Sequence, residues 1–284
     1  MATTGTIAVV GAGTMGRGIA QVFAQSGHTV MLYDAFPNAV ESALKQIGSM
    51  LDKGVEKGKL TADAAAGAKE RLRPVKNLRD VGRCNLVVEA VVEKVPTKLE
   101  VYQAAQGSLT EDGILASNTS SISITQLAAG VARPDRFIGM HFFNPVPLMQ
   151  LVEVVRGLQT SDDTARRTIE LAKALGKTPI ECHDSPGFIS NRVLMPMINE
   201  AVCCLQEHVA TAEAIDGIMK LGMNHPMGPL ALADLIGLDV CLDILEVLHR
   251  ELGDDRYRPC PLLRTMVRAG RLGKKTRHGF YKYE

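Results

Sequence analysis

The stretch TIAVVGAGTMGRGIAQVFAQSGHTVMLYD, residues 6–34, decides the fold of this chain. A short β-rich run, Thr6 to Val10, leads into the glycine motif GAGTMG, and a helical pattern follows as far as Gly27. A second apolar run, Thr29 to Tyr33, ends at Asp34. The glycine motif thus follows a strand and opens a helix, which is the context that turns a weak GxGxxG pattern into a usable one. The stretch predicts a strand, a helix and a second strand.

The glycine motif predicts a dinucleotide site. Gly11 provides the tight turn, and Gly13 lets the backbone approach a pyrophosphate closely. Gly16 lets the helix pack against the strand. The amino end of the helix, at Thr14 and Met15, favours the anion because its backbone N–H groups and the helix dipole both attract negative charge.

Asp34 indicates which dinucleotide binds. It stands 23 residues after Gly11 (34 − 11), close to the spacing of about 20 residues expected for the acid that holds the adenosine ribose. A carboxylate accepts from a ribose 2′-hydroxyl but repels a 2′-phosphate, and residues 35–40 contain no Lys or Arg to neutralise one. The sequence therefore favours NAD over NADP.

Composition describes an ordinary globular protein. The chain has 284 residues, of which 46% are hydrophobic, and a net charge of +1. This length favours two domains, and the charge balance predicts neither nucleic acid nor a membrane surface as a partner.

The six cysteines lack a CxxC pair or metal-ligand spacing, so we expect no metal site and a reducing, cytoplasmic location. The amino end has no basic n-region, so neither a secretory signal nor a transit peptide is expected.

Alternating strand and helix patterns fill residues 1–185, and helical patterns fill 186–284. Further strands are expected at Asn85–Val92, Ile114–Ser117, Arg136–Met140, Gln150–Val155 and Thr178–Cys182. Helices beyond Pro186 are expected at Gly187–His208, Thr211–Leu221, Pro229–Arg250 and Leu262–Ala269. The pattern predicts an α/β fold, a doubly wound Rossmann-type sheet domain with a helical hairpin insertion near 36–76, followed by a smaller all-α domain.

A lone histidine, His141, precedes a turn that contains Pro145 and Pro147. Proline lacks the backbone N–H and restricts the residue before it, so the chain is expected to run strand, bent loop, strand. Glu153 lies in the second of these strands, where it can orient the histidine as a base. The alternative is a core histidine that is hydrogen-bonded to the backbone.

Charged residues cluster around the strand expected at 85–92. Glu89 lies inside it, and Glu93 and Lys98 follow its carboxyl end. Ligands sit at the carboxyl ends of strands in open α/β sheets. Glu93 and Lys98 can equally form a surface ion pair.

Five short polar residues, Ser117 to Ser121, follow the strand expected at 114–117. Either Ser120 or Ser121 can cap a helix expected at Ile122–Ala129, since serine accepts from the first free N–H groups of a helix. The other serine then faces the ligand cleft.

A stripe of polar residues lies on the first helix of the hairpin. Its members recur at intervals of four and are Lys45, Ser49, Lys53 and Lys57. Residues four apart share one helix face, and like charges there repel mildly. A bound polyanion would relieve this repulsion. The alternative is a solvated surface whose field is softened by Glu41, Asp52 and Glu56.

Seven motifs occur in order along the chain. They are GAGTMG at 11–16, EAVVEKVPTK at 89–98, SNTSS at 117–121, HFFNPVP at 141–147, LVEVV at 151–155, DSPGFISNR at 184–192 and GPLALADLIGLD at 228–239. Together they resemble the L-3-hydroxyacyl-CoA dehydrogenases, most closely the short bacterial enzymes of the 3-hydroxybutyryl-CoA dehydrogenase type. The resemblance spans essentially the whole chain.

The resemblance implies an NAD-dependent oxidoreductase that interconverts 3-hydroxyacyl-CoA and 3-ketoacyl-CoA. His141 and Glu153 match the family's catalytic pair, with His141 taking the hydroxyl proton and Glu153 fixing its tautomer. Ser120 matches the serine that contacts the reacting oxygen beside the nicotinamide. Asn191 matches an asparagine that contacts the substrate from the helical domain.

The resemblance also assigns ligand contacts and partners. NAD contacts fall on Asp34, Glu93, Lys98, Asn118, Asn144 and Lys275. The family's helical hairpin helps to hold coenzyme A, which makes Lys53 and Lys57 candidate contacts for its phosphates. A homodimer through the helical domain is expected, because apolar helices need cover.

One departure from the family pattern lies near the carboxyl end. The family usually reads KTGxGFY, whereas Arg277 replaces the first glycine here. A left-handed backbone at Arg277 would be strained, which weakens the assignment of Lys275 to NAD.

Two other functions stay open. A dehydrogenase of a free hydroxy acid or sugar acid would not need the lysine stripe. A non-catalytic NAD-binding protein is also possible, since folds do not determine function, but the intact set of Ser120, His141, Glu153 and Asn191 favours an enzyme.

Overall fold

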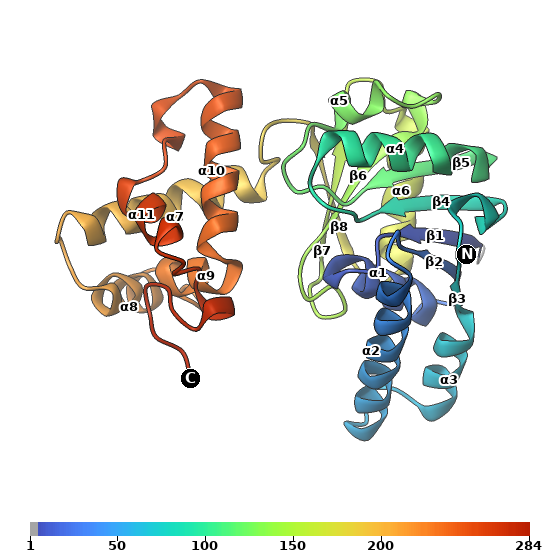
Figure 1. The fold of residues 1–284 in the computed structure, drawn as a ribbon, viewed down its shortest axis with the longest axis horizontal. Coiled ribbons are helices and arrows are strands. Elements are labelled where there is room, and N and C mark those ends of the chain that lie inside the picture. Colours follow the sequence, from blue (N-terminus) through green and yellow to red (C-terminus); the bar gives the residue numbers. More distant parts are fainter. Residues whose placement is uncertain (1–4) are drawn as a thin grey trace. The chain divides into compact units, whose positions relative to one another are not determined.

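The computed structural model describes residues 5–284. The chain divides into two compact units, Met1–Asp184 and Ser185–Glu284, drawn from blue to yellow-green and from yellow to red in Figure 1. Each unit has its own hydrophobic core.

The first unit is built on an eight-stranded sheet with the order β3-β2-β1-β4-β5-β6-β7-β8. Its strands are β1 (Thr6–Val10), β2 (Thr29–Tyr33), β3 (Leu72–Pro74), β4 (Cys84–Glu89), β5 (Leu109–Ser117), β6 (Phe137–Phe142), β7 (Leu151–Arg156) and β8 (Thr178–His183). Neighbouring strands are parallel except β6 and β7, which are antiparallel. The strand order reverses at β1, between β2 and β4, and this is where open sheets of this kind bind ligands.

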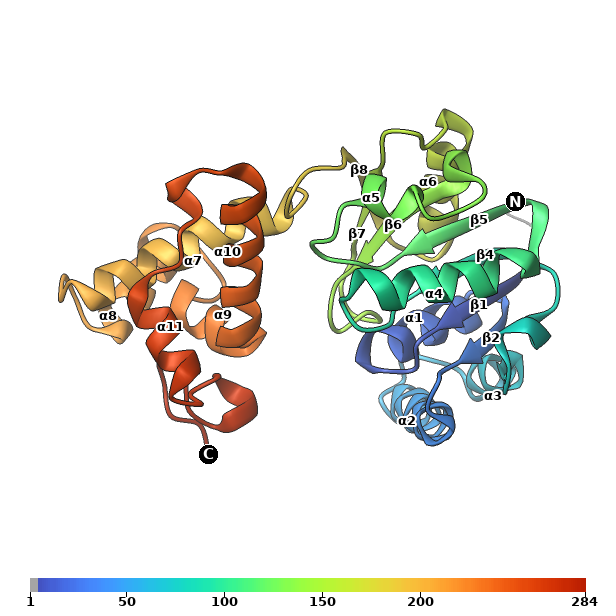
Figure 2. The same cartoon turned by 45° about the horizontal axis from the view of Figure 1, so that its top comes forward.

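Helices cover both faces of this sheet. They are α1 (Thr14–Gln25), α2 (Pro37–Glu56), α3 (Ala62–Arg71), α4 (Val95–Ala105), α5 (Ile124–Ala128) and α6 (Asp162–Ala174). One core joins α1, α2, α3 and α6 to strand residues such as Val88 and Ile138. Tyr102 of α4 packs edge-on against Phe137, with ring centroids 5.1 Å apart. Because Phe137 and Ile138 are consecutive in β6, they face opposite sides, so α4 covers the other face, as Figure 2 shows.

The second unit is helical. Its helices are α7 (Ser190–Gln206), α8 (Ala212–Gly222), α9 (Pro229–Ile236), α10 (Leu238–Leu252) and α11 (Pro261–Arg268). Short 3-10 helices occur in the first unit at Leu78–Val81, Gln106–Ser108 and Pro134–Arg136, and in the second unit at Asp255–Tyr257 and Lys274–Thr276. A buried carboxylate, Asp234, accepts from the backbone N–H groups of Phe280 and Tyr281 and from the Tyr283 hydroxyl. These bonds fasten the carboxyl-terminal segment onto α9.

Two expectations about individual elements were wrong, and one strand was not expected. The stretch Pro229–Arg250 is two helices, because Gly237 between them has φ +109°, a backbone state that ends α9 and that glycine adopts without strain. The sequence did not predict β3, which has only three residues. The helix expected at 122–129 starts at Ile124 and is capped by Ser123, whose hydroxyl accepts from the Gln126 N–H.

Residues 5–284 contain neither a membrane-spanning helix nor a cluster of metal ligands. No helix in that range is long and apolar enough to cross a membrane. The same residues contain no group of three or more His, Cys, Asp or Glu side chains placed to hold a metal ion.

Candidate active site

His141 and Glu153 face each other across two antiparallel strands. The register of β6 and β7 places them directly opposite, and the distance from His141 Nδ1 to Glu153 Oε2 is 2.8 Å. Their exposed fractions are 8% and 3%. The expected passage of strand, bent loop and strand is confirmed, since β6 ends at Phe142 and β7 begins at Leu151. A cross-strand pair of this kind is held by the whole ladder around it.

This geometry suits an oriented base. If Nδ1 donates its proton to the Glu153 carboxylate, Nε2 carries the lone pair that can take a proton from a substrate. The buried carboxylate then stabilises the imidazolium that forms, as in other histidine and carboxylate pairs. The Phe143 ring lies 4.5 Å from the His141 ring, centroid to centroid, and shields one side of it.

The loop between β6 and β7 is anchored at Val146 and Met149. The Lys177 ammonium donates to the backbone carbonyls of Val146 and Met149, at 2.6 and 2.8 Å. Burial lowers the pKa of this ammonium from its ordinary value. Val146 also packs against α1, where a Cβ at Gly18 would lie 2.9 Å from the Val146 Cβ. The loop that follows His141 therefore rests on the helix of the glycine motif.

The glycine motif forms an open cradle at the end of β1. Gly11 has φ +103°, and a Cβ there would lie 2.5 Å from the Ala90 carbonyl oxygen, so only glycine fits. A Cβ at Gly16 would overlap the Gly11 carbonyl. By contrast, a Cβ at Gly13 would meet nothing within 4 Å, and Gly13 is exposed at the amino end of α1, which no side chain caps. This opening fits the pyrophosphate of NAD, because the backbone N–H groups of the first turn face it.

Asp34 directly follows β2 and lies beside this cradle. Its Oδ2 accepts from the Ala12 N–H at 2.7 Å, and its Oδ1 accepts from the Phe36 N–H at 2.9 Å. These two bonds hold the carboxylate next to the glycine loop. Each carboxylate oxygen can accept more than one hydrogen bond, so both can also receive ribose hydroxyls.

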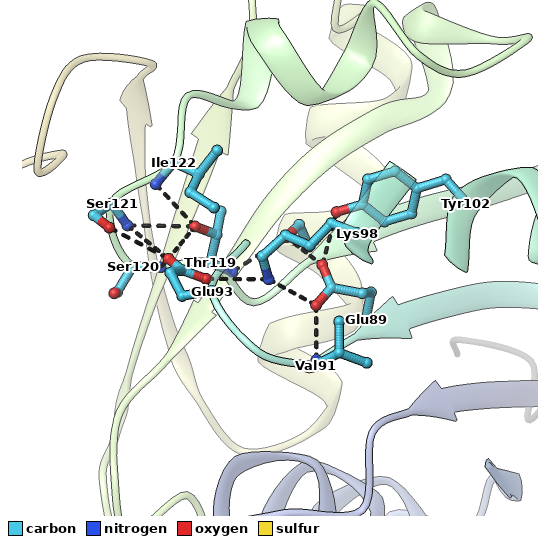
Figure 3. A network of polar contacts seen from close by, with 10 residues as sticks. Glu89, Val91, Glu93, Lys98, Tyr102, Thr119, Ser120, Ser121 and Ile122 are labelled. Carbon is cyan, nitrogen blue, oxygen red and sulfur yellow. Dashed lines mark hydrogen bonds and ion pairs between the residues drawn. The ribbon is translucent and has the colours of Figure 1, made fainter. Parts of the chain in front are cut away.

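The hydroxyl-rich loop after β5 is gathered around Glu93, as Figure 3 shows. Glu93 Oε1 accepts from the Ser120 N–H at 2.9 Å, and Glu93 Oε2 lies 3.1 Å from the Lys98 ammonium. Burial by itself raises the pKa of the Glu93 carboxyl, but the Lys98 charge and the bonds from Thr119 and Ser120 lower it overall. Glu93 and Lys98 do pair, but only the Glu93 end lies at the surface, because their side chains are 37% and 1% exposed.

Asn118 braces the strand that carries His141. Its Oδ1 accepts from the Phe142 N–H at 2.9 Å, and its own N–H donates to the Glu89 carbonyl. These bonds link the ends of β4, β5 and β6. Asn144, another expected cofactor residue, is exposed in the loop after β6.

Two expected site residues belong to the helical unit. Asn191 lies in the first turn of α7 and is 9% exposed. Lys275 forms an ion pair with Asp239, with its ammonium 2.5 Å from both carboxylate oxygens. Arg277 does adopt the left-handed conformation that the sequence raised as a concern, with φ +57°.

The members of the lysine stripe are all exposed. Helix α2 ends at Glu56, so Lys57 is its C-cap rather than a helical residue, although its N–H still donates to the Lys53 carbonyl. Asp52 pairs with Lys69 of α3 at 2.6 Å. Part of the negative charge expected to soften the stripe is therefore turned toward the neighbouring helix.

Sequence reasoning missed four residues that shape the site, namely Tyr102, Thr119, Lys177 and Asp184. Asp184 joins α5 to the end of β8, because its Oδ2 accepts from the Ser123 hydroxyl and the Thr125 N–H. Most of their hydrogen bonds join residues that are between 26 and 61 positions apart in the sequence. The contacts therefore cannot be predicted from a local pattern. Two of the four stood in quoted motifs, Thr119 in SNTSS and Asp184 in DSPGFISNR.

Comparison with protein families identifies the chain. The family model for the 3-hydroxyacyl-CoA dehydrogenase NAD-binding domain matches residues 6–185, and the model for the C-terminal domain of the same enzymes matches residues 187–283. The chain belongs to the 3-hydroxyacyl-CoA dehydrogenase family. The expected fold class, the NAD-dependent enzyme class and NAD as the cofactor are thereby confirmed.

Individual members of the family cover nearly the full length. A probable 3-hydroxybutyryl-CoA dehydrogenase of Deinococcus radiodurans is 59% identical over 97% of this chain and 99% of its own. The structure of an (S)-3-hydroxybutyryl-CoA dehydrogenase from Ralstonia eutropha has a TM-score of 0.96 and 51% identity, covering 99% of this chain and all of its own. A diketoreductase described as acting on dicarbonyl compounds has a TM-score of 0.86 and 27% identity, with full coverage of both chains.

Proposed function

We propose that this 3-hydroxyacyl-CoA dehydrogenase interconverts short-chain L-3-hydroxyacyl-CoA thioesters, such as 3-hydroxybutyryl-CoA, with the corresponding 3-ketoacyl-CoA. The observation that carries the catalytic part is the buried pair of His141 and Glu153, 2.8 Å apart in the sheet that bears the glycine motif. The short acyl chain is supported by the names of the relatives that are 59% and 51% identical.

In the proposed oxidation, His141 takes the proton of the C3 hydroxyl on Nε2. Glu153 keeps the ring in the tautomer that allows this and stabilises the imidazolium. NAD, when bound, supplies the acceptor for the hydride that leaves C3. In the reverse direction the imidazolium of His141 returns its proton to the carbonyl oxygen.

Ser120 and Asn191 are proposed to donate hydrogen bonds to the reacting oxygen. Preorganised donors at a developing oxyanion are each worth about 3 kcal/mol in well-measured sites. The support for Ser120 is the loop geometry, because the Glu93 carboxylate holds its backbone N–H at 2.9 Å. For Asn191 the support is its match within the motif DSPGFISNR.

The proposed NAD contacts are Gly11, Gly13, Thr14, Met15, Gly16, Asp34, Glu93, Lys98, Asn118, Ser120, Asn144 and Lys275. Contacts near the glycine motif are supported by the open cradle at Gly13 and the oriented carboxylate of Asp34. For Lys275 the ion pair with Asp239 competes with a cofactor role, because the Lys275 ammonium already donates to both oxygens of the Asp239 carboxylate.

Coenzyme A phosphates are proposed to bind at Lys53 and Lys57. Both ammonium groups are exposed, and a phosphate between them would offset their mutual repulsion. Replacing both lysines by alanine should raise KM for the thioester and leave NAD affinity unchanged. The control is a double replacement of Lys59 and Lys76, which removes the same charge elsewhere. An unchanged KM would mean that the stripe is ordinary surface.

The helical unit is proposed to form a homodimer. Apolar side chains stand exposed on it, including Val193 at 69%, Val209 at 68% and Leu221 at 90%. Exposed apolar groups in this number favour association. We also propose a cytoplasmic location, which suits the six free cysteines of the chain.

The substrate class is tested by following NADH absorbance with acetoacetyl-CoA and with free acetoacetate. We expect rapid NADH oxidation with the thioester and little with the free acid, because only the thioester carries phosphates for the stripe. Reaction with the free acid alone would replace the proposal by a dehydrogenase of free hydroxy acids. Reaction with neither would favour a non-catalytic NAD-binding protein.

A further inference from the structure

The loop after β5 folds around one carboxylate oxygen. Glu93 Oε1 accepts hydrogen bonds from the Thr119 hydroxyl at 2.5 Å, the Ser120 N–H at 2.9 Å, the Ser121 N–H at 3.3 Å and the Ser121 hydroxyl at 3.4 Å. Figure 3 shows these donors converging on Glu93. Consecutive backbone N–H groups of this kind form a concave nest for an anion. Here the chain supplies its own anion.

Thr119 closes the loop from the other side. Its hydroxyl oxygen accepts from the Ile122 N–H at 2.9 Å while its hydroxyl proton goes to Glu93. Its backbone N–H donates to the Ser117 hydroxyl at 3.2 Å. Residues on both sides of Ser120 are therefore fixed by hydrogen bonds.

A buried ion pair holds Glu93 itself in place. Lys98 lies 3.1 Å from Glu93 Oε2 and 2.7 Å from Glu89 Oε1. The side chains of Lys98 and Glu89 are 1% and 0% exposed, whereas that of Glu93 is 37% exposed. The deep pair thus ties the half-exposed carboxylate to the core of the sheet.

The Glu89 carboxylate is itself fully engaged. Besides Lys98, it accepts from the Val91 N–H at 2.8 Å, the Tyr102 hydroxyl at 2.7 Å and the Ser117 hydroxyl at 2.8 Å. Buried charges are stable only when they are paired and hydrogen-bonded in this way. The Ser117 hydroxyl oxygen also accepts from the Thr119 N–H. Glu89 is therefore linked to the loop through Ser117 as well as through Lys98 and Glu93.

We propose that Glu93 is a positioning residue that holds the Ser120 loop for catalysis, and that the Glu89 and Lys98 pair fixes Glu93 for this task. The inference rests on the proposed role of Ser120 at the reacting oxygen. It goes beyond the NAD contact proposed for Glu93, because the four donors that meet Glu93 Oε1 all belong to the loop. A displacement of the loop would move the Ser120 hydroxyl and reduce turnover, since preorganised donors lose their effect when misplaced.

The decisive variant is Glu93→Gln, which keeps the shape and one oxygen acceptor but removes the charge. We expect kcat at saturating NAD to fall by roughly 10- to 100-fold, a loss that further NAD does not restore. The matched control is Glu100→Gln, which removes one charge from an exposed position of α4. A normal kcat at saturating NAD would overturn the inference, because Glu93 would then act only as a cofactor ligand.

A double-variant cycle with Ser120→Ala tests whether Glu93 acts through the serine. Residues that act as one unit are not additive. We therefore expect Glu93→Gln to lower kcat by less than about threefold further once Ser120 is alanine. Multiplying losses would show that the two residues act independently and would contradict the inference.

Amide hydrogen exchange of the apo-protein separates this inference from the proposed function. The Ser120 and Ser121 amides should exchange at least about 10-fold faster in Glu93→Gln than in the wild type and in Glu100→Gln. If the wild type failed to oxidise the thioester yet showed this change, the proposed substrate would fall and the loop anchor would stand. Unchanged exchange would overturn the anchor whatever the activity.

Discussion

Two glutamates of the same sheet are almost fully buried, yet their surroundings give them different tasks. Glu89 ends β4 and is paired with the ammonium group of Lys98. Glu153 lies within β7 and is paired with the imidazole ring of His141, the side-chain type that most often acts as a general acid or base. A carboxylate paired with a lysine ammonium anchors structure, whereas one paired with an imidazole can support proton transfer.

The neighbours of the two carboxylates strengthen this contrast. Glu89 is 0% exposed and lies beneath the Ser120 loop, where it receives donors from strand, helix and loop. His141 is 8% exposed and stands one residue before the end of β6. A histidine that transfers a proton must be accessible to the substrate, whereas a carboxylate that anchors the structure needs only its hydrogen-bond and ion-pair partners.

The largest expected effect comes from His141→Ala. Turnover should fall by roughly 10²–10⁴, the usual worth of a general base, while NAD binding is retained because the glycine cradle is untouched. Steady-state rates and NAD titration measure the two quantities. His183→Ala, an exposed histidine of β8, serves as the control. Near-normal turnover in His141→Ala would remove this residue from the mechanism.

The same substitution at the two glutamates should separate their roles. Glu89→Gln leaves the buried Lys98 charge without its nearest partner and should lower the free energy of unfolding by about 3–5 kcal/mol. Glu153→Gln can leave a neutral histidine in place, so the main loss should be in kcat. Denaturant unfolding and rates on the same samples give both values. Equal stability losses in the two variants would break the contrast between anchor and relay.

A smaller loss is expected from Tyr102→Phe. The ring still packs against Phe137, but the hydrogen bond to Glu89 at 2.7 Å is removed. Hydrogen bonds to charged groups contribute about 1.5–3 kcal/mol, so unfolding should become easier by that amount. Chemical denaturation detects it. If stability did not change, Glu89 would not depend on this donor.

The smallest expected effect is on thermal stability at low pH. The folded state lowers the pKa of Glu93 below its ordinary value of 4.5, so the carboxylate adds stability above pH 4.5 that is lost as the pH falls through the lower, folded pKa. Glu93→Gln should therefore show a shallower decline of Tm below pH 4.5 than the wild type. Thermal melts from pH 7 to 3 test this, with Glu100→Gln as control. Parallel curves for all three proteins would contradict it.

Local patterns carried much of the fold. The strand, glycine turn and helix at 6–25 follow from apolar runs and from backbone states that glycine favours, as Gly11 shows with φ +103°. The proline-containing turn after His141 followed in the same way. The break at Gly237 was not predicted, because a single glycine inside an apolar run does not by itself end a helix.

Long-range contacts could not be predicted in this way. The sequence predicted that Lys98 contacts NAD or pairs at the surface, but it gave no sign that the Lys98 ammonium lies buried between two carboxylates. Lys177 gave no signal at all, because its partners are backbone carbonyls 28 and 31 residues away. Only the packing of β8 against the loop brings them together.

The sequence by itself determined the dinucleotide-binding unit and its preference for NAD, because glycine geometry and the charge of Asp34 act over a few residues. Its motifs also indicated the family to which the chain belongs. The tertiary structure decided which buried carboxylate faces a histidine and which faces a lysine. That choice depends on strand register and burial, and both arise only when distant segments pair in the folded sheet.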